Sequence, residues 1–375
     1  MILQLLNNEP TCESFYHKEK IEKIEIDKIK EYSFAWNHHS ILEDTNFTYL
    51  SVLAGQQPLI DFAECRESYR EMQDKVTAHK KAALAAKICL EDFCFYDLIP
   101  EHLLKKWLNI QRTCFERIRN VKTRQQDYEI LHKAHVLTRN IAEQKISYGE
   151  RIGKVKYNIF GSQTGRLTTK KGSVPVLTLK KEQRFLLKPQ NDAFVELDLN
   201  AAEIRMLMAL NGKPQPKGDI HQHLKKEIFG ESTKRSEFKE RLFAWLYNPN
   251  SDDTVFDSFF SRETFRDFFV AEEKVLTTPF GRRLAVDERK AQNYLLQSTT
   301  SDQVLENAYK IQKILKGKKS TIAFTLHDSI VLDMSQEDAI MIRDIKEQFE
   351  KTKWGNFMST CKIGKNFGDL KELKV

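Results

Sequence analysis

Hydrophobic residues recur at helical spacing between residues 65 and 146, and this pattern predicts long amphipathic helices. Pro100 stands where a first helical turn would begin, because its fixed φ suits that position. Apolar positions then follow every three to four residues, at Leu104, Trp107, Leu108, Cys114, Phe115 and Ile118 and again at Tyr128, Leu131, Ala134 and Ile141. Two such helices with a short connection suggest an antiparallel hairpin. The pattern fits a packing module as well as an element that grips a nucleic acid.

The pattern changes after Gly153, where short strands alternate with helices. The segments that we distinguish are a strand at 194–198, a helix at 201–210, a charged helical block at 219–274 and a hairpin at 321–333. The first strand ends in Asp198, and the hairpin carries His327, Asp328 and Ser329 at its tip. This order of elements indicates a mixed α/β (α+β) domain with a helical insertion.

The composition is that of an ordinary globular chain, with 41% hydrophobic and 30% charged residues among 375. No apolar run approaches the ~20 residues that cross a bilayer, so we expect no membrane partner. The N-terminus has no positive region ahead of its short apolar stretch, which argues against a secretory signal. The six cysteines are scattered without a Cys-x-x-Cys pair. A cytoplasmic location without a disulfide framework or a structural zinc site is therefore expected.

The charge balance is moderately basic, with 60 Lys and Arg against 53 Asp and Glu and a net charge of +7. A solvated, Lys-rich surface accounts for this excess as well as a polyanionic partner such as a nucleic acid does. The choice between them depends on motifs rather than on charge.

Two aspartates from distant parts of the chain, Asp198 and Asp328, each stand where a strand ends or turns. Carboxylates at the rim of one sheet can hold two divalent cations ~3.5–4 Å apart, which clamp the attacking and leaving oxygens in phosphoryl transfer. Mg²⁺ suits such a site because it prefers oxygen ligands and keeps waters and substrate phosphates. Either aspartate taken alone is more often a turn residue or a helix cap.

One predicted helix carries two cations and two aromatic rings on a single stripe. A spacing of four residues relates Arg235, Lys239, Phe243 and Tyr247. Successive members drift by only ~40° around the helix, so all four share one face. The cations suit a triphosphate and the rings suit a base, and His221 upstream adds a candidate phosphate donor. The alternative is an amphipathic helix with an aromatic core edge and a solvated basic end.

A second row of four-residue spacing consists of Arg289, Asn293 and Gln297. All three side chains donate hydrogen bonds, and minor-groove edges present acceptors on every correct base pair. Such a row can check the geometry of a base pair without reading its sequence. The alternative is a polar stripe that faces solvent.

Taken in order, these motifs resemble the family A DNA polymerases, the DNA polymerase I family. The matching elements are Thr164–Leu167 for the T-G-R-L element, Asp198–Arg205 for motif A, the Arg235–Tyr247 stripe for motif B, Arg289–Gln297 for the minor-groove helix, His327–Asp328 for motif C and Gly364–Phe367 for the closing G-x-x-W. Each motif alone is weak, but their joint order and spacing are specific. The resemblance covers residues 150–375 well and residues 65–150 only by helical character. The compact form resembles polymerases of tailed bacteriophages.

The resemblance implies a right-hand polymerase with an antiparallel palm sheet, helical fingers and a helical thumb. The expected divisions are an N-terminal segment of uncertain role (1–64), a thumb (65–150), a palm in two parts (151–210 and 275–375) and fingers (211–274). The implied reaction is template-directed addition of dNTPs to a primer 3′-OH, with two Mg²⁺ ions as cofactors.

The resemblance also implies a role for each matching residue. Asp198 and Asp328 would hold the two ions, and Lys239 would give a proton to the leaving pyrophosphate. The nucleotide-binding group would comprise His221, Arg235, Lys239, Phe243, Tyr247 and Glu203, the last as the steric gate that excludes a ribose 2′-OH. The residues that would contact primer–template DNA are Arg166, Arg289, Asn293, Gln297 and His327.

Three positions depart from the family pattern. Ala201 replaces a Gln in motif A, Asn248 replaces a Gly after motif B, and Ser329 replaces the usual Glu of motif C. Serine at the last position is the choice of single-subunit RNA polymerases, which share the fold, so an RNA polymerase or primer-making enzyme is one alternative. Glu203 favours DNA synthesis, because those RNA enzymes have a small residue at the gate. A non-catalytic nucleic-acid-binding replisome protein is the other alternative.

Family members often carry an N-terminal 3′–5′ exonuclease domain, which needs roughly 150 or more residues. Here the thumb-like helices occupy most of that space, and Asp61 and Glu64 make no recognisable nuclease signature. We therefore expect a polymerase without proofreading that acts in phage DNA replication in the host cytoplasm. A separate exonuclease, a clamp or a helicase are its candidate partners.

Overall fold

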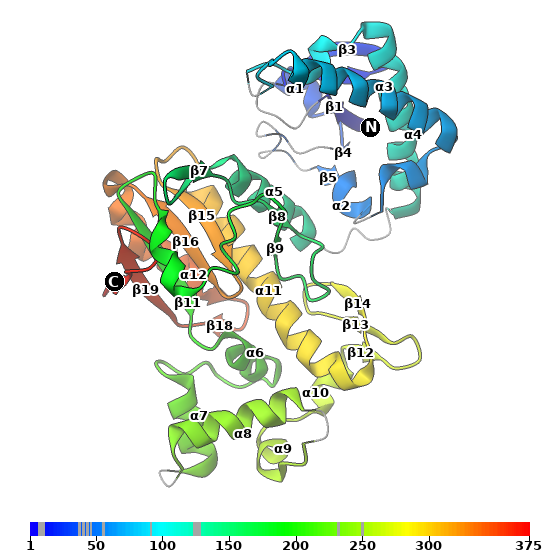
Figure 1. The fold of residues 1–375 in the computed structure, drawn as a ribbon. Coiled ribbons are helices and arrows are strands. Elements are labelled where there is room, and N and C mark those ends of the chain that lie inside the picture. The colour runs from blue at the N-terminus through cyan, green and yellow to red at the C-terminus, as the bar shows by residue number, and fades with distance from the viewer. Residues whose placement is uncertain are drawn as a thin grey trace. The chain divides into compact units, whose positions relative to one another are not determined.

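A computed structural model describes the whole chain apart from residues 7–11, 37–38, 40–41, 43–44, 46, 55–56, 91, 123–128, 231–232 and 249–250. The chain divides into two compact units, residues 1–136 (unit 1) and residues 137–375 (unit 2). Each unit has its own sheet and helices (Figure 1). Among the described helices, none combines the length and the apolar composition that a membrane span requires.

Unit 1 contains a mixed five-stranded sheet with the order β3-β2-β1-β4-β5. Its strands are β1 (Ile2–Leu5), β2 (Ser14–His17), β3 (Lys20–Lys23), β4 (Phe34–Ala35) and β5 (Thr48–Tyr49). β1 runs antiparallel to β2 and parallel to β4, and β4 runs parallel to β5. The sequence analysis predicted none of these strands, because strands of two to four residues are too short to show a clear period.

The helices of unit 1 include the long ones that the periodicity predicts. They are α1 (Ile26–Ile29), α2 (Leu50–Ala54), α3 (Arg66–Ala85) and α4 (Glu101–Lys122), and α5 (Ile130–Glu143) begins in this unit and ends in unit 2. Short 3₁₀ helices lie at Leu59–Phe62 and Phe95–Leu98. The predicted start of a helix at Pro100 is confirmed. The predicted connection between α4 and α5 falls on residues 123–128, which lie outside the described residues.

The strands and helices of unit 1 share their hydrophobic cores. Leu6 of the N-terminal segment packs in one cluster with Leu108 of α4, and Ile2 of β1 packs in another with Phe115 and Ile118. The buried Gln4 donates a hydrogen bond to the Leu108 carbonyl oxygen at 3.0 Å. Residues 1–64 thus fold together with the helices that follow them, whereas the sequence expectation set them apart.

Unit 2 is organised around an antiparallel sheet with the order β15-β16-β11-β19-β20. The strands are β11 (Ala193–Leu199), β15 (Thr321–Leu326), β16 (Ser329–Met334), β19 (Ser359–Gly364) and β20 (Lys371–Glu372). The helices α6 (Ala202–Leu210), α11 (Glu288–Ile314) and α12 (Ile342–Glu350) pack on one another or on this sheet (Figure 1). The predicted strand, helix and hairpin are confirmed by β11, α6 and the β15–β16 pair.

The helical block of unit 2 consists of α7 (Ile220–Phe229), α8 (Arg235–Tyr247), α9 (Thr254–Phe259) and α10 (Glu263–Arg266). Its core is aromatic: Phe238 and Trp245 of α8 pack against Phe256 of α9, and all three are fully buried. The expected block is therefore present. Its end is not helical, because β12 (Phe269–Val270) pairs there with β13 (Val275–Thr277), which in turn pairs with β14 (Arg283–Ala285).

Smaller sheets complete unit 2. They are β10-β6-β7, a β8–β9 pair and a β17–β18 pair. Their strands are β6 (Ile146–Tyr148), β7 (Arg151–Gly153), β8 (Tyr157–Asn158), β9 (Thr168–Thr169), β10 (Leu187–Lys188), β17 (Lys351–Thr352) and β18 (Gly355–Asn356). 3₁₀ helices lie at Lys181–Leu186 and Gln336–Met341. The loop between β8 and β9 carries the T-G-R-L element.

Candidate active site

Asp198 and Asp328 lie side by side at one end of the β11–β16 pair. Asp198 is opposite Ser329 in the strand register, and the Leu199 amide donates to the Asp328 carbonyl oxygen at 3.2 Å. Burial first, and then the negative charge of Asp328, raises the pKa of Asp198 to about 7. Lys362 acts in the opposite direction, but it forms an ion pair with Glu196 at 3.4 Å. Two carboxylates therefore share a place where their charge is poorly compensated.

A divalent cation fits this pair. Mg²⁺ takes oxygen ligands from one or two carboxylates and fills its shell with water and substrate phosphates. A cation would also relieve the repulsion that raises the Asp198 pKa. In the part of the chain that the structure describes, no group of three or more His, Cys, Asp or Glu could hold a metal ion. A metal at this place would therefore depend on Asp198, Asp328 and the substrate.

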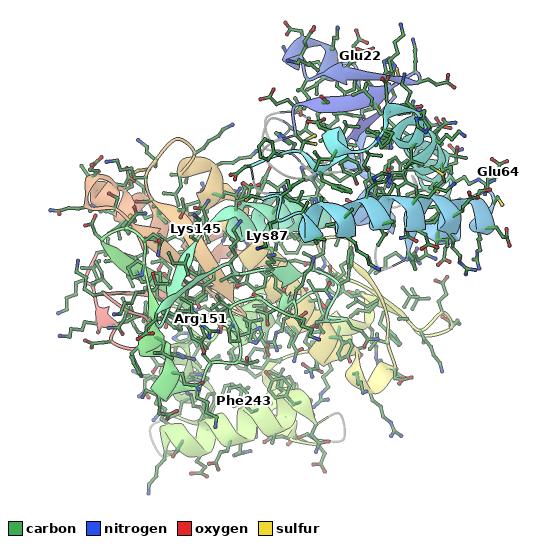
Figure 2. The ribbon with its side chains drawn as sticks, turned by 45° about the horizontal axis from the view of Figure 1, so that its top comes forward. Glu22, Glu64, Lys87, Lys145, Arg151 and Phe243 are labelled. Atoms are coloured by element: carbon green, nitrogen blue, oxygen red, sulfur yellow. The ribbon has the colours of Figure 1, made fainter. Side chains whose placement is uncertain are left out.

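Helix α8 presents its predicted stripe because its opposite side is apolar. Phe238, Leu242 and Trp245 are fully buried, which leaves the Phe243 and Tyr247 rings 36% and 40% exposed. These two rings stack with their centroids 5.8 Å apart and an angle of 11° between their planes. Figure 2 shows Phe243 on the side of α8 that faces the rest of unit 2.

The cationic end of the stripe lies beside α7. Asp219 caps α7, its carboxylate accepting from the His221 amide at 2.9 Å and from Arg235 at 2.6 and 3.0 Å. Burial, followed by the positive charge of Lys239, lowers the pKa of His221 to about 4, so its imidazole is neutral at pH 7. The His221 Nδ1 is buried and has no hydrogen-bond partner among the described residues. Its ring meets the Phe243 ring edge-on at 6.1 Å.

Glu203 joins the helical block to the sheet side of unit 2. Its two carboxylate oxygens accept hydrogen bonds from Arg166 and from the Tyr247 hydroxyl. Burial and then this bond to Glu203 raise the pKa of the Tyr247 phenol far above its usual range. Glu203, the predicted steric gate, is therefore held in place by hydrogen bonds from two different segments of the chain.

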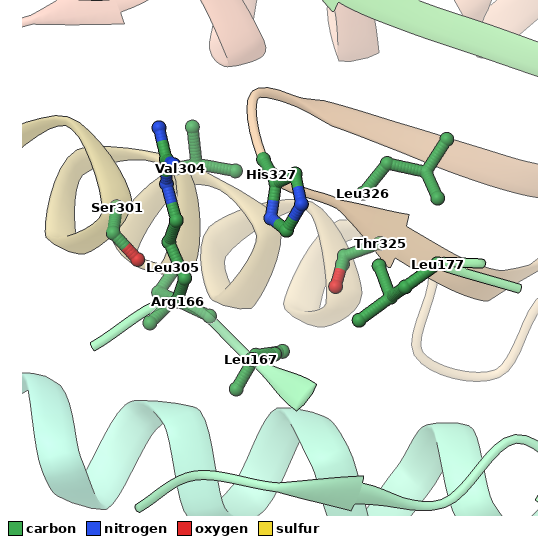
Figure 3. A pocket seen from close by; sticks show the side chains of 9 residues that line it. All are labelled: Arg166, Leu167, Leu177, Ser301, Val304, Leu305, Thr325, Leu326 and His327. Carbon is green, nitrogen blue, oxygen red and sulfur yellow. The ribbon is translucent and has the colours of Figure 1, made fainter. Parts of the chain in front are cut away.

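A cavity of about 160 Å³ lies where these side chains meet. Its lining comes from five separate segments of the chain: Arg166; Ala201, Ala202, Glu203 and Ile204; Phe243 and Tyr247; Gln297, Thr300 and Ser301; and His327 and Asp328. A second pocket, of about 10 Å³, adjoins it and shares Arg166, Ser301 and His327 (Figure 3). Burial and the neighbouring Arg166 lower the pKa of His327, which keeps that imidazole neutral.

The donor row of α11 reaches the cavity at one end only. Gln297 lines the cavity, whereas Asn293 and Arg289 lie one and two turns further toward the N-terminus of α11 and are absent from its lining. Arg289 is exposed, and the Asn293 Oδ1 is buried without a partner among the described atoms. The structure thus places the predicted residues in separate groups. One group lines the cavity, a basic group consists of His221, Arg235 and Lys239, and Arg289 and Asn293 lie apart from both on α11.

Sequence reasoning missed Ser301 and Thr300, which line the cavity from α11. The signal for Ser301 was present, because it continues the spacing of Asn293 and Gln297 by one more turn. The Ser301 side chain is small and leaves space in the cavity that a larger side chain would fill. The polar row of α11 therefore continues beyond Gln297 to Ser301.

Sequence reasoning also missed the ion pair that supports the T-G-R-L element. Arg282 donates to Asp302 at 2.7 Å, and Asp302 is fully buried. The guanidinium lies against the Gly165 backbone, where a Cβ would come within 2.1 Å of the Arg282 Nη2. Gly165 also has a φ of +78°, which glycine adopts readily. Arg282 and Gly165 therefore set the position from which Arg166 reaches Glu203.

Comparison with known proteins found no matching family model. One curated relative, a DNA polymerase of Bacillus phage SP01, is 23% identical over an alignment that covers 60% of this chain and 33% of that protein. The chain spans about a third of the length of this relative.

Among solved structures, the chain is similar to the POL domain of Pol1 from M. smegmatis in complex with DNA primer-template and dNTP. The identity is 15%, the TM-score is 0.49, and the match covers 85% of this chain and 66% of that chain. A likeness at this level does not establish a common fold. The sequence relative and the site geometry therefore carry more weight than this neighbour.

Proposed function

We propose that this chain is a template-directed DNA polymerase of the family A type, which adds dNTPs to a primer 3′-OH in phage DNA replication. One observation carries the proposal: residues that separate motifs select independently line a single cavity. A polymerase needs this convergence, because the primer end, the incoming nucleotide and the carboxylates must meet within one reacting distance. The phage polymerase relative supports the same class of activity.

In this proposal Asp198 and Asp328 hold two Mg²⁺ ions. When bound, the ions stabilise the attacking and leaving oxygens of the transferred phosphoryl group. The chain contributes the position of these carboxylates, which the strand register sets side by side. His327, next in the chain to Asp328, is neutral and faces the place that we assign to the primer terminus.

The triphosphate would lie along the cationic end of α8. Lys239 forms no ion pair among the described residues, so it is free to bind phosphate and to give a proton to the leaving pyrophosphate. Neutral His221 can act as a hydrogen-bond donor to phosphate. Arg235 would contribute after exchanging Asp219 for a phosphate, since a bidentate guanidinium suits either anion.

The base and sugar would occupy the cavity itself. The stacked Phe243 and Tyr247 rings offer a flat face to the base. Glu203 would exclude a ribose 2′-OH, and its bonds to Arg166 and Tyr247 hold its carboxylate in place. Arg166 and Gln297 would contact the minor groove at the primer end, with Arg289 and Asn293 further along the duplex.

We also propose that the chain has no 3′–5′ proofreading activity. Asp61 and Glu64, which make no recognisable nuclease signature, are exposed and form surface ion pairs with Arg66 and Arg117 at 3.2 and 3.9 Å. Incubation of the purified chain with labelled single-stranded DNA tests this directly. Shortening from the 3′ end that copurifies with the chain would contradict it.

The main test is primer extension on a recessed DNA template with Mg²⁺, with dNTPs compared with rNTPs. We expect extension with dNTPs only, and its loss in Asp328→Asn. Asp344→Asn, an exposed carboxylate on α12, is the matched control and should extend normally. Normal extension by Asp328→Asn would disprove the metal assignment.

The same experiment separates the alternatives. Ser329, which is buried opposite Asp198, is the feature that favours an RNA polymerase or primer-making enzyme, and extension with rNTPs would support it. DNA binding without extension of either nucleotide would instead support a non-catalytic replisome protein.

A further inference from the structure

One segment of unit 2 concentrates positive charge far beyond the average of the chain. Residues 145–188 contain eleven Lys and Arg and two Glu, a net charge of +9, whereas the whole chain has +7. Within the described residues, Arg166 is the only one of these eleven that forms an ion pair. Surface cations that no carboxylate of their own chain neutralises are typical of a surface that meets a polyanion.

The β8–β9 hairpin places two of these lysines directly opposite each other. Asn158 pairs with Thr168 and Tyr157 with Thr169, and the Lys170 amide then donates to the Lys156 carbonyl oxygen at 2.8 Å. Both lysine side chains are exposed, and opposed like charges on one face destabilise an antiparallel pair. Among the residues that the structure describes, neither lysine forms an ion pair with a carboxylate, so the hairpin keeps this unfavourable arrangement uncompensated.

The hairpin is also tied firmly to the proposed catalytic hairpin. The buried Tyr157 hydroxyl accepts from the Thr325 amide at 3.0 Å and donates to the Thr325 carbonyl oxygen at 2.6 Å. Thr325 stands two residues before His327 on β15. The loop that follows β8 carries Arg166 into the cavity. The lysine pair is therefore held at a set distance from the candidate primer-end site.

That distance can be expressed in nucleotides. Lys170 follows Arg166 by four residues, which corresponds to ~13 Å of extended chain. One strand of B-DNA places a phosphate every ~3.4 Å along the helix axis. The lysine pair would thus stand at most roughly four nucleotides from the phosphate nearest Arg166.

We propose that Lys156 and Lys170 form a docking point for the phosphate backbone of the duplex that leaves the cavity, within about four nucleotides of the primer end. This inference rests on the proposed polymerase function for the identity of the duplex. Lys171, the next exposed cation on the same turn, extends the docking point. The pair supplies salt-dependent affinity and takes no part in the chemical step.

The test is the salt dependence of binding to a primer–template duplex, measured by fluorescence anisotropy without nucleotide. In Lys156→Gln/Lys170→Gln we expect the slope of log affinity against log salt to fall by about 1.8, that is ~0.9 for each lost contact. The loss of affinity between roughly 50 and 200 mM salt would then be about twelvefold smaller than in the wild type. The control is Lys20→Gln/Lys23→Gln on β3, which removes the same charge from exposed positions of unit 1.

Two further measurements distinguish docking from a structural role. The melting temperature of the double variant should stay level or rise, because a like-charge pair has been removed, and extension at saturating DNA should keep the wild-type rate. Neutral methylphosphonate linkages about three to five nucleotides upstream of the primer end should weaken binding by the wild type but not by the variant.

The outcomes separate this inference from the proposed function. A slope equal to that of the control, or a loss of binding accompanied by a lower melting temperature, would overturn the docking point even if extension is normal. The same slope change for single-stranded DNA of equal length would overturn its assignment to the duplex. A reduced slope in a chain that extends no primer would leave the docking point standing and remove the polymerase function.

Discussion

The two units differ in how their charged side chains are compensated by neighbouring charges. On the long helices of unit 1, lysines pair with glutamates one turn away, as Lys75 does with Glu71 and Lys105 with Glu101, each at 2.6 Å. In unit 2 the two aspartates of the candidate site adjoin each other, and two lysines of the β8–β9 hairpin do the same. Unit 2 has paired charges as well, but its unfavourable groupings lie at and around the cavity.

The difference indicates where a ligand is expected. A surface pair one turn apart on a helix is compensated within the chain and needs nothing further. Like charges held together by the fold lower stability unless a bound ion or polyanion offsets them, so they mark candidate functional sites.

The largest effect is expected at the carboxylate pair. Asp328→Asn should reduce the extension rate by on the order of 10³-fold or more, because metal-based charge stabilisation supplies several kcal/mol. Steady-state extension with Mg²⁺ measures this, and duplex binding should remain near the wild-type value. A reduction of less than tenfold would mean that this pair is not the catalytic one.

The same variant should alter the pH dependence of stability without metal. The pKa of Asp198 is raised to about 7 from 3.8, so its contribution to stability is fully present below pH 3.8 and is lost as the pH rises through 7. Asp328→Asn removes one cause of this rise and should flatten the fall in melting temperature over that interval. Burial, the larger cause, remains, so part of the fall should persist. Melting curves in EDTA provide the measurement, and an unchanged fall would refute the coupling between the two carboxylates.

The next largest effect concerns the support of the T-G-R-L element. Gly165→Ala should destabilise unit 2 by about 2–5 kcal/mol, because a positive φ and a clash with Arg282 add together. Gly172→Ala is the control, since Gly172 has a φ of +80° but nothing within 4 Å of the new Cβ, and it should lose only about 1–2 kcal/mol. Chemical denaturation measures both, and equal losses would mean that the Arg282 contact has no energetic weight.

A smaller effect is expected on sugar selectivity. Glu203→Ala removes the proposed gate and both of its hydrogen bonds, and it should admit ribonucleotides with selectivity reduced by roughly 10–100-fold. Tyr247→Phe keeps the gate but removes one of its donors, so it should lose less selectivity. The ratio of kcat/KM for dNTP and rNTP measures both variants. Unchanged ratios in Glu203→Ala would remove the gate role.

The smallest effect is expected in unit 1. Lys105→Gln breaks the exposed pair with Glu101 and should leave the free energy of unfolding close to the wild-type value, with extension unchanged. Denaturant unfolding measures the stability of this variant, and primer extension measures its activity. A large loss of extension would contradict the contrast between the units.

The sequence predicted those elements whose signal is local. The strand at 194–198 was predicted with its bounds, and the four-residue spacings predicted a helix at the α8 stripe and another at Arg289–Gln297, although not where these helices begin and end. The sheet of unit 1 depends on pairing between distant segments, and β4 and β5 are only two residues long. Such strands exist because of their neighbours, so no local pattern could reveal them.

The residues of the candidate site also fall into those that the sequence predicted and those that it did not. The α8 stripe and the Asp198–Asp328 pair were expected, and the structure brings Phe243 and Tyr247 together with Asp328 around one cavity. The Arg282–Asp302 pair was not expected, because its importance comes from the backbone of Gly165, which is distant in sequence. The assignment of thumb, palm and fingers stays a prediction.

The buried side of α8 has a mechanical consequence. Phe238 of this helix packs on both Phe229 of α7 and Phe256 of α9, so helices α7 to α9 are joined by one aromatic cluster. The stripe shares the backbone of α8 with this cluster, so a displacement of the cluster would carry all four stripe residues with it. Gly212 and Gly218, with positive φ and open space at their Cβ positions, lie in the connection from α6. A change of backbone dihedrals at these two glycines would therefore displace the cations and both rings of α8 together.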